Sequence, residues 1–306
     1  MILSLALASA IFAQDEAKKE EPKKEAKSLE EAFKLADVKG QIRAIYQSNS
    51  KIDDTSTSGK LSSSGDFLIG GKLSIETAPL YGVSVGATFY TSNAIANKKD
   101  YKDGDYYNNT KDYTVLGEAF AKYSFKDGEI KVGRMELDTP LANSDDIRMT
   151  PDLFTAAIVT YSPIDKLKIT GGVVTQMAGW ENGNDHSRFV KMGEVIKSAT
   201  ADIDTNNGNT NWADFFANNN GALESKLYLA GVSYEHDIFA AQAWYGRQTE
   251  IMDTYYLEAG VKPFESDMLG VNLTAQYMNE KAIGKLKSYS TGAGLENTKI
   301  NSNIYN

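Results

Sequence analysis

Apolar and polar residues alternate along this chain in runs of about ten residues. In the run at residues 269–277, one face of an extended strand would carry Leu269, Val271, Leu273, Ala275 and Tyr277, and the other Gly270, Asn272, Thr274 and Gln276. One face suits lipid and the other suits water. Strands of soluble sandwiches average about 5 to 6 residues, whereas strands that cross a bilayer need about 9 to 11. The pattern therefore predicts an all-β fold, an antiparallel up-and-down transmembrane β-barrel.

Eleven such strands are predicted. They cover approximately residues 38–47, 66–77, 81–92, 113–125, 128–136, 153–162, 166–177, 226–236, 237–248, 253–262 and 267–278. Long polar loops follow the first, third, fifth and seventh strands, whereas the connections at 78–80, 126–128, 163–166, 235–237 and 263–266 are short. Bacterial outer-membrane barrels have short periplasmic turns, long external loops and an even number of strands. The odd number predicted here leaves open a miscount or missing strands.

The two ends of the chain differ from the alternating part. Residues 2–13 form an apolar run that is too short for a membrane helix, so residues 1–13 are predicted to be a signal peptide remnant. Residues 14–37 are predicted to be a charged periplasmic tether with a short helix at 28–36, because Ser28 and Glu31 have capping-box spacing. Residues 38–306 then hold a partial barrel. The signal lacks its usual basic segment and residues 285–306 have loop composition, so we expect truncation at both ends.

Composition narrows the function. The 306 residues carry a formal charge of -9 with a pI near 4.9, which argues against nucleic acid as a partner. The chain has no cysteine for a soft metal, and its two histidines, His186 and His236, fall in a loop and a turn, so no strand offers a serine and histidine pair for hydrolysis. The acidic run at residues 100–112 does not match a calcium-binding loop. The sequence therefore predicts neither an enzyme nor a metal or cofactor site.

The polar face of each strand would look into a water-filled lumen. This phase yields nine candidate channel-lining residues: Arg43, Lys72, Glu76, Glu118, Lys122, Lys131, Lys168, Glu258 and Lys262. Arg134 is a tenth candidate, on the expectation that it turns inward at the end of its strand. A basic wall that holds a carboxylate and passes it along is expected from Arg43, Lys72, Lys122, Lys131 and Lys168. The plainer interpretation is that these positions are polar only because water fills the lumen.

Two arginines do not fit the alternation. Arg134 is in phase with Ile130 and Val132, which are predicted to face lipid, so we expect a bulge or an inward turn at this position. Arg247 is in phase with Tyr245, so it too would carry a charge on the face that is predicted to contact lipid.

The segment Val132 to Pro151, VGRMELDTPLANSDDIRMTP, contains a Gly-Arg strand end, Thr-Pro, Ala-Asn-Ser-Asp-Asp-Ile-Arg and Met-x-Pro. At these spacings it resembles the third extracellular loop of the OprD-like outer-membrane porins. The SLEEAF motif from Ser28 and Gly-Gly-Lys-Leu in the second strand are also similar to that family. The resemblance implies an eighteen-stranded barrel in the outer membrane of a Gram-negative bacterium, with a third loop that folds inward and narrows the lumen.

The resemblance also implies a role for the loop residues. The predicted constriction consists of Asp138, Asn143, Ser144, Asp145, Asp146 and Arg148. Its carboxylates are expected to face the basic wall; alternatively, Asp145, Asp146 and Arg148 form a salt bridge that fixes the loop. Members of the family admit small solutes such as amino acids or carboxylates.

Two functions remain open from the sequence. The first is passive diffusion of small, charged solutes through the lumen, with outer-membrane lipid around the barrel and a homo-oligomer left open. The second is a non-conducting surface or adhesion protein that binds through its long external loops. The aromatic cluster Trp212, Phe215 and Phe216 in the longest loop supports the second, although these rings are also suited to packing the loop on itself or to gating the outer mouth.

Overall fold

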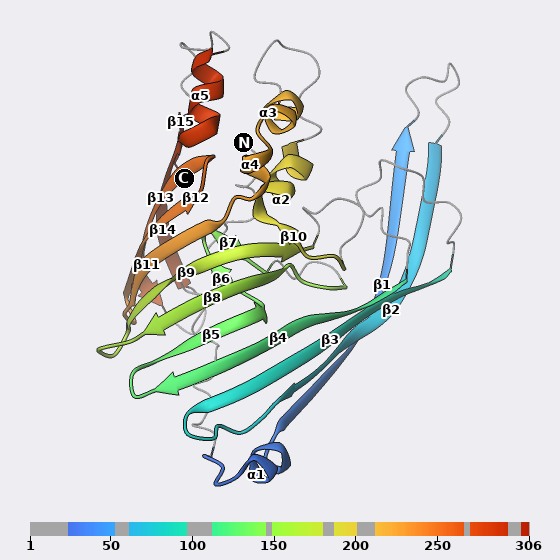
Figure 1. Ribbon diagram of the computed structural model, residues 1–306, viewed down its shortest axis with the longest axis vertical. Helices are drawn as coiled ribbons and strands as arrows, with labels where there is room; N and C mark the ends of the chain where they lie inside the picture. Colours follow the sequence, from blue (N-terminus) through green and yellow to red (C-terminus); the bar gives the residue numbers. More distant parts are fainter. Residues whose placement is uncertain are drawn as a thin grey trace.

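A single curved sheet makes up most of the molecule (Figure 1). The computed structural model describes residues 24–52, 61–96, 112–144, 149–179, 187–200, 212–265, 270–292 and 301–305. The strands of the sheet pair antiparallel in the order β1-β2-β3-β4-β5-β8-β9-β11-β12-β13-β14-β15. Successive hairpins therefore build an up-and-down meander, as the sequence predicts.

The sheet strands are β1 (Asp37–Ile52), β2 (Leu61–Glu76), β3 (Val83–Ala96), β4 (Tyr113–Phe125), β5 (Gly128–Met135), β8 (Leu153–Tyr161), β9 (Leu167–Ala178), β11 (Leu227–Glu235), β12 (Phe239–Gln248), β13 (Met252–Glu265), β14 (Gly270–Ala282) and β15 (Asn301–Tyr305). The short strands are β10 (Val190–Lys191), which pairs with β9, and β6 (Asp138–Thr139) and β7 (Ala142–Asn143), which pair with each other. The helices are α1 (Leu29–Lys34), α2 (Met192–Thr200), α3 (Trp212–Asn218), α4 (Asn220–Leu223) and α5 (Gly284–Gly292). In the described ranges, no helix has the length and apolar character needed to cross a bilayer.

The two faces of the sheet differ in the way that the alternation predicts. In β3, Val83, Val85 and Phe89 are each about half exposed, whereas Ser84 and Thr88 between them are buried. Large apolar side chains are also exposed on the outside of the other strands. On the concave face, polar side chains adjoin a buried apolar cluster that includes Phe154, Val174 and Leu229. A sheet with this distribution is suited to lipid outside and water inside.

The predicted strands are confirmed. Eleven strands of eight to sixteen residues correspond to the eleven predicted ones, and β4 has the predicted bounds of 113–125. The first three strands extend further toward the long loops than predicted, because their backbones stay paired, for example at Asn49 and Ser64, where Ser and Asn residues no longer alternate with apolar ones. Backbone hydrogen bonds thus continue the ladder beyond the end of the side-chain pattern.

The predicted helix near the start is confirmed as α1. The Ser28 hydroxyl accepts a hydrogen bond from the backbone N–H of Glu31 at 3.1 Å. The Glu31 carboxylate accepts one from the backbone N–H of Lys27 at 2.8 Å, one residue earlier than in a standard capping box. Ala32 is buried against Ala78, in the short turn between β2 and β3, which places α1 at the short-turn end of the sheet (Figure 1).

The remaining helices are not expected from the sequence. The interpretation of residues 285–306 as loop is wrong, because they include most of α5 and all of β15, which pairs with β14. Phe215 and Phe216 of α3 are buried against Ile251, in the turn before β13, and against Leu286 of α5. Apolar contacts between segments far apart in the sequence stabilise these helices, and the composition of one loop does not reveal such contacts.

An ion pair joins two short turns at one end of the sheet. Lys166 Nζ, just before β9, lies 2.6 Å from Asp237 Oδ1, just before β12. The hydrogen bond from Lys166 lowers the pKa of the Asp237 carboxyl below its ordinary value of 3.8. The same bond raises the pKa of Lys166 above 10.5. Both groups are in contact with solvent, so their contribution to stability is small.

Replacing Asp237 by Asn removes this ion pair. Because the pKa of Asp237 is lowered on folding, its stabilising effect is complete above pH 3.8 and is lost as the pH falls through the folded-state value. Because the pKa of Lys166 is raised, its effect is complete below pH 10.5 and is lost at higher pH. We expect Asp237→Asn to lower the urea midpoint slightly and evenly between about pH 5 and 9, with the difference shrinking below about pH 4. A difference that grows on acidification would contradict this assignment.

Candidate functional site

The connection between β5 and β8 folds onto the concave face of the sheet. We call residues 136–152 the crossing segment; its hairpin of β6 and β7 lies inside the curve of the sheet (Figure 1). At the hairpin tip, the Thr139 hydroxyl accepts hydrogen bonds from the N–H groups of Leu141 (3.3 Å) and Ala142 (2.9 Å). It also donates to the Ala142 carbonyl at 3.0 Å. The hairpin therefore satisfies its own polar groups and can pack against the wall.

The hairpin packs on strands that are remote in sequence. Leu137 belongs to a buried apolar cluster with Trp244 of β12 and Tyr256 of β13, and Leu141 packs against the same cluster. Gly246 of β12 admits the Leu141 side chain, because a Cβ at that position would lie 2.9 Å from Leu141 Cδ1. Gly246 thus forms a notch that receives the tip of the hairpin.

The other end of the crossing segment packs on the opposite part of the sheet. Met149 is buried, and its Cε would lie 2.8 Å from a Cβ placed on Gly70 of β2. The next residue, Thr150, shares a hydrogen bond of 2.7 Å with the Tyr113 hydroxyl at the start of β4. The tip of the hairpin therefore contacts β12, whereas Glu136 at the start of the segment and Met149 near its end lie against β2.

Three lysines of the predicted basic wall have glutamate partners on the same face. The pairs are Lys72–Glu136 (3.1 Å), Lys122–Glu76 (2.6 Å) and Lys131–Glu118 (3.8 Å), each measured from Nζ to Oε1. Further hydrogen bonds come to Glu136 from the Tyr90 hydroxyl and to Glu118 from the Thr88 hydroxyl. Each of these lysines therefore stands beside a carboxylate, and positive and negative charges alternate on this part of the wall. The role of the lysines as a basic wall for solutes stays a prediction.

The sequence interpretation missed Glu136. This residue is the first of the crossing segment, and its carboxylate contacts both Lys72 and Tyr90 on neighbouring strands. It follows β5 directly, and no local motif marks it as part of the wall. Only the pairing of β2, β3, β4 and β5 brings these three side chains together.

The other predicted basic positions lie on β1, β9 and β13. Arg43 Nε donates to the neighbouring Gln41 side chain at 2.9 Å. Lys168, opposite Ser233 of β11, has no hydrogen-bond or ion-pair partner among the described residues. Lys262 lies on the same face of β13 as Glu258, four residues closer to the short-turn end of the strand.

Glu258 marks a second polar cluster, on β12 to β14. Its carboxylate is buried and accepts hydrogen bonds from Gln242, from Tyr256 at 2.9 Å and from Gln276 at 3.1 Å. Trp244 donates to Gln242 at 2.7 Å and so orients that amide. These donors satisfy the carboxylate without a cation from the described residues. Within the same described ranges, no group of three or more His, Asp or Glu side chains is arranged to hold a metal ion.

Both out-of-phase arginines have partners. The Arg134 guanidinium lies 4.2 Å from the centre of the Phe189 ring and donates to the Leu116 carbonyl at 3.2 Å. The pairings of β5 keep their register at Arg134, and shifts of register lie in the neighbouring pairings of β3 with β4 and of β8 with β9. The place of Arg134 in the channel lining stays a prediction. Arg247, on the outer face, makes two hydrogen bonds of 2.7 and 2.8 Å to Asp253 of β13.

Three of the six predicted constriction residues are described. Asp138 and Asn143 pair across the hairpin and are exposed, and the Ser144 hydroxyl accepts a hydrogen bond from the Leu137 N–H at 2.9 Å. The others, Asp145, Asp146 and Arg148, lie outside the described residues. Their proposed salt bridge and their orientation toward the wall stay predictions.

The curved meander and its apolar outer face are those of a membrane β-barrel protein. The chain belongs to the OprD family, whose description is outer membrane porin and which matches residues 74–304. The predictions of the family, of the fold class and of a location in the outer membrane of a Gram-negative bacterium are confirmed. The family consists of channels, so the prediction that the protein is not an enzyme is also confirmed.

Solved structures support the fold. Pseudomonas aeruginosa OpdK, solved with vanillate, is 15% identical with a TM-score of 0.59, and the match covers 88% of this chain and 60% of that one. P. aeruginosa OpdL is 18% identical (TM-score 0.55; 82% and 57% covered), and Acinetobacter baumannii OccAB1 is 15% identical (TM-score 0.58; 82% and 54% covered). The chain therefore spans between 54% and 60% of the length of these relatives. No curated protein matches the sequence.

Gly246→Leu tests how the crossing segment is held. The new side chain would occupy the space of Leu141, so we expect the hairpin tip to detach and its amides to exchange hydrogen faster. Loss of one leucine contact of about 1–2 kcal/mol corresponds to roughly tenfold faster exchange at Leu141 and Ala142. The control is Ala243→Leu, on the same strand but on the outer face. Exchange rates that do not change in residues 137–144 would show that the notch does not hold the segment.

Proposed function

We propose that the complete protein forms a water-filled channel through which small charged solutes, such as amino acids or carboxylates, diffuse passively across the outer membrane. The crossing segment is the observation that carries this proposal. Its hairpin tip packs at Gly246 of β12 and Met149 packs at Gly70 of β2, and a segment held on the concave face in this way is suited to narrowing a lumen. Membership of a porin family supports the same function.

The paired charges of the wall give this passage its chemistry. A solute carboxylate can replace a glutamate beside Lys72, Lys122 or Lys131, and a solute amino group can replace the lysine beside the glutamate. Each exchange gives a weak interaction, because a charge that already has a partner is partly neutralised. A series of weak sites allows a solute to bind and leave, as passage through a channel requires.

The ends of the chain have roles that fit this location. We propose that residues 1–13 belong to an export signal and that residues 14–37 are a periplasmic tether. Helix α1 supports this proposal, because it packs beside Ala78 at the end of the sheet that carries the short turns.

Buried aromatic rings disfavour the alternative of a surface adhesin. That hypothesis depends on the aromatic cluster of the longest loop, but Phe215 is 0% and Phe216 is 1% exposed. Both rings pack against Ile251 and Leu286, so they stabilise the outer loops and are not available to a partner. The side chain of Trp212 lies outside the described residues.

Planar-bilayer recording tests the proposal. Addition of the refolded full-length protein is expected to raise the current in discrete steps, one for each inserted channel. Insertion is followed separately by the heat-dependent electrophoretic shift that folded barrels show. A protein that folds and inserts but gives no conductance steps would overturn the proposal.

Glu136→Gln and Lys72→Gln are expected to change ion selectivity in opposite directions. Glu136→Gln leaves Lys72 without its carboxylate partner and makes the passage more positive, whereas Lys72→Gln makes it more negative. A unit charge about 10 Å from an ion in water changes the ion's energy by about 0.4 kcal/mol, or roughly twofold in permeability. Because anions and cations respond oppositely, we expect the anion-to-cation permeability ratio to rise about fourfold in the first variant and to fall about fourfold in the second.

Reversal potentials in a salt gradient measure this ratio. Asp237→Asn is the matched control, because it removes one negative charge at an exposed short turn outside the passage. A ratio that is the same in Glu136→Gln and Lys72→Gln would contradict a role for the Lys72–Glu136 pair in selectivity.

A further inference from the structure

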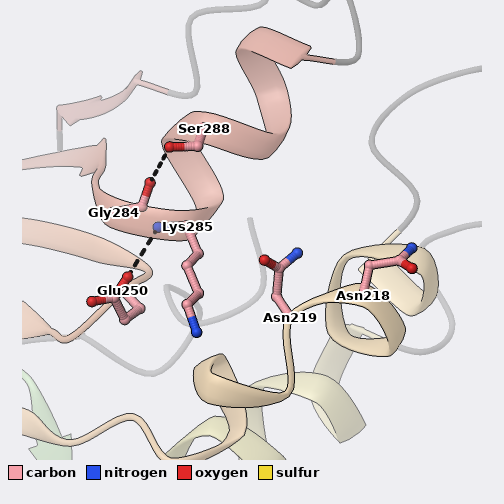
Figure 2. Close-up of a pocket in the computed structure, with 6 residues that line it drawn as sticks. All are labelled: Asn218, Asn219, Glu250, Gly284, Lys285 and Ser288. Carbon is pink, nitrogen blue, oxygen red and sulfur yellow. Dashed lines mark hydrogen bonds between the residues drawn. The ribbon is translucent and has the colours of Figure 1, made fainter.

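A cleft at the long-loop end of the sheet is separate from the inner wall. It has a volume of about 570 Å³ and is lined by Asn218, Asn219, Glu250, Gly284, Lys285 and Ser288 (Figure 2). These residues come from the junction of α3 and α4, from the turn between β12 and β13 and from the first two turns of α5. The apolar cluster of Phe215, Phe216, Ile251 and Leu286 joins the three elements and gives the cleft fixed walls.

Lys285 carries a charge that the surrounding protein does not neutralise. None of the described residues accepts a hydrogen bond from its Nζ or lies within ion-pair distance of it. The side chain is only partly exposed, and Nζ would lie 1.9 Å from a Cβ placed on Gly221 of α4. The absence of a side chain at Gly221 therefore makes room for the ammonium group.

Glu250 supplies the opposite charge. Its Oε2 accepts a hydrogen bond from the backbone N–H of Lys285 at 3.2 Å, which fixes the start of α5. Its backbone φ is +66°, a conformation that a residue other than glycine keeps only where the surroundings enforce it, and such residues cluster at functional sites. The Asn219 amide donates to the Phe215 carbonyl at 2.9 Å, and its oxygen lies on the side toward Lys285 (Figure 2).

We propose that this cleft is a docking site, at the outer mouth of the channel, for a small zwitterion that carries a carboxylate and an ammonium group. The carboxylate binds Lys285 Nζ, and the ammonium is held by the Glu250 carboxylate and the Asn219 amide oxygen. The two charges of the lining sum to zero. A simple carboxylate therefore meets the repulsion of Glu250 and a simple amine that of Lys285, whereas a zwitterion meets neither. The inference rests on the proposed channel function, because docking here concentrates the solute at the mouth.

Three probes of similar size test the charge requirement: L-alanine, propionate and propylamine. Ligand-observed NMR titrations with the refolded full-length protein in detergent measure their affinities. We expect L-alanine to bind at least about tenfold more tightly than either of the others, because each of them lacks one charge-assisted hydrogen-bonding group. Equal affinity for L-alanine and propionate would overturn the zwitterion assignment.

Lys285→Met tests the residue. Loss of the ammonium is expected to weaken L-alanine binding about tenfold, and Gly221→Val is expected to weaken it as well, because the valine side chain takes the place of Nζ while the charge remains. Lys287→Met is the matched control, because it removes the same charge from α5 outside the cleft. Folding of every variant is checked by far-UV circular dichroism and by the electrophoretic shift.

The two proposals fail in different ways. Unchanged L-alanine affinity in folded Lys285→Met would overturn the docking site and leave the channel proposal intact. L-alanine binding that depends on Lys285, in a protein without conductance steps, would support the docking site and overturn the channel.

Discussion

The need to pair every backbone N–H and C=O group within hydrocarbon is the constraint on which the structure depends. A long antiparallel meander meets it, because from β1 to β14 each strand of the meander pairs with the next over at least seven residues. The alternation of side chains follows from the same geometry, since a strand turns each successive residue to the opposite face. Val85 is 46% exposed on the outside while the adjacent Ser84 is 3% exposed on the inside, and this contrast separates a lipid-facing surface from a polar one.

The connection between β5 and β8 packs on the concave face of the sheet, against β2 and β12. Among its described residues, a small hairpin is followed by Met149, and Leu141 at the hairpin tip and Met149 pack at glycines, Gly246 in β12 and Gly70 in β2. Glycine is required at these positions because side chains would fill the space that Leu141 and Met149 occupy. The hydroxyl of Thr139 satisfies the polar groups of the hairpin tip, so the segment can pack closely without leaving them unpaired.

Features encoded in local patterns could be predicted from the sequence, whereas features that depend on register could not. Alternation identified the strands, and the S-x-x-E spacing identified α1, because both signals lie within a few residues. The partner of Arg247 could not be named, since Asp253 lies opposite it only in the register of β12 and β13. Glu136 was missed for the same reason. The outer helices escaped prediction because their stability comes from contacts such as that of Phe215 with Leu286, between separate loops.

The wall and the outer cleft use the same residue types in opposite ways. On the wall each of three lysines is already paired with a glutamate, so an arriving charge must displace an existing partner and gains little. In the cleft, Lys285 has no partner among the described residues, and one Glu250 oxygen serves the backbone of α5, so a solute with both charges gains new interactions there without breaking an ion pair. In the proposed channel, unpaired charges are therefore suited to capture at the mouth, and paired charges are suited to passage through the lumen.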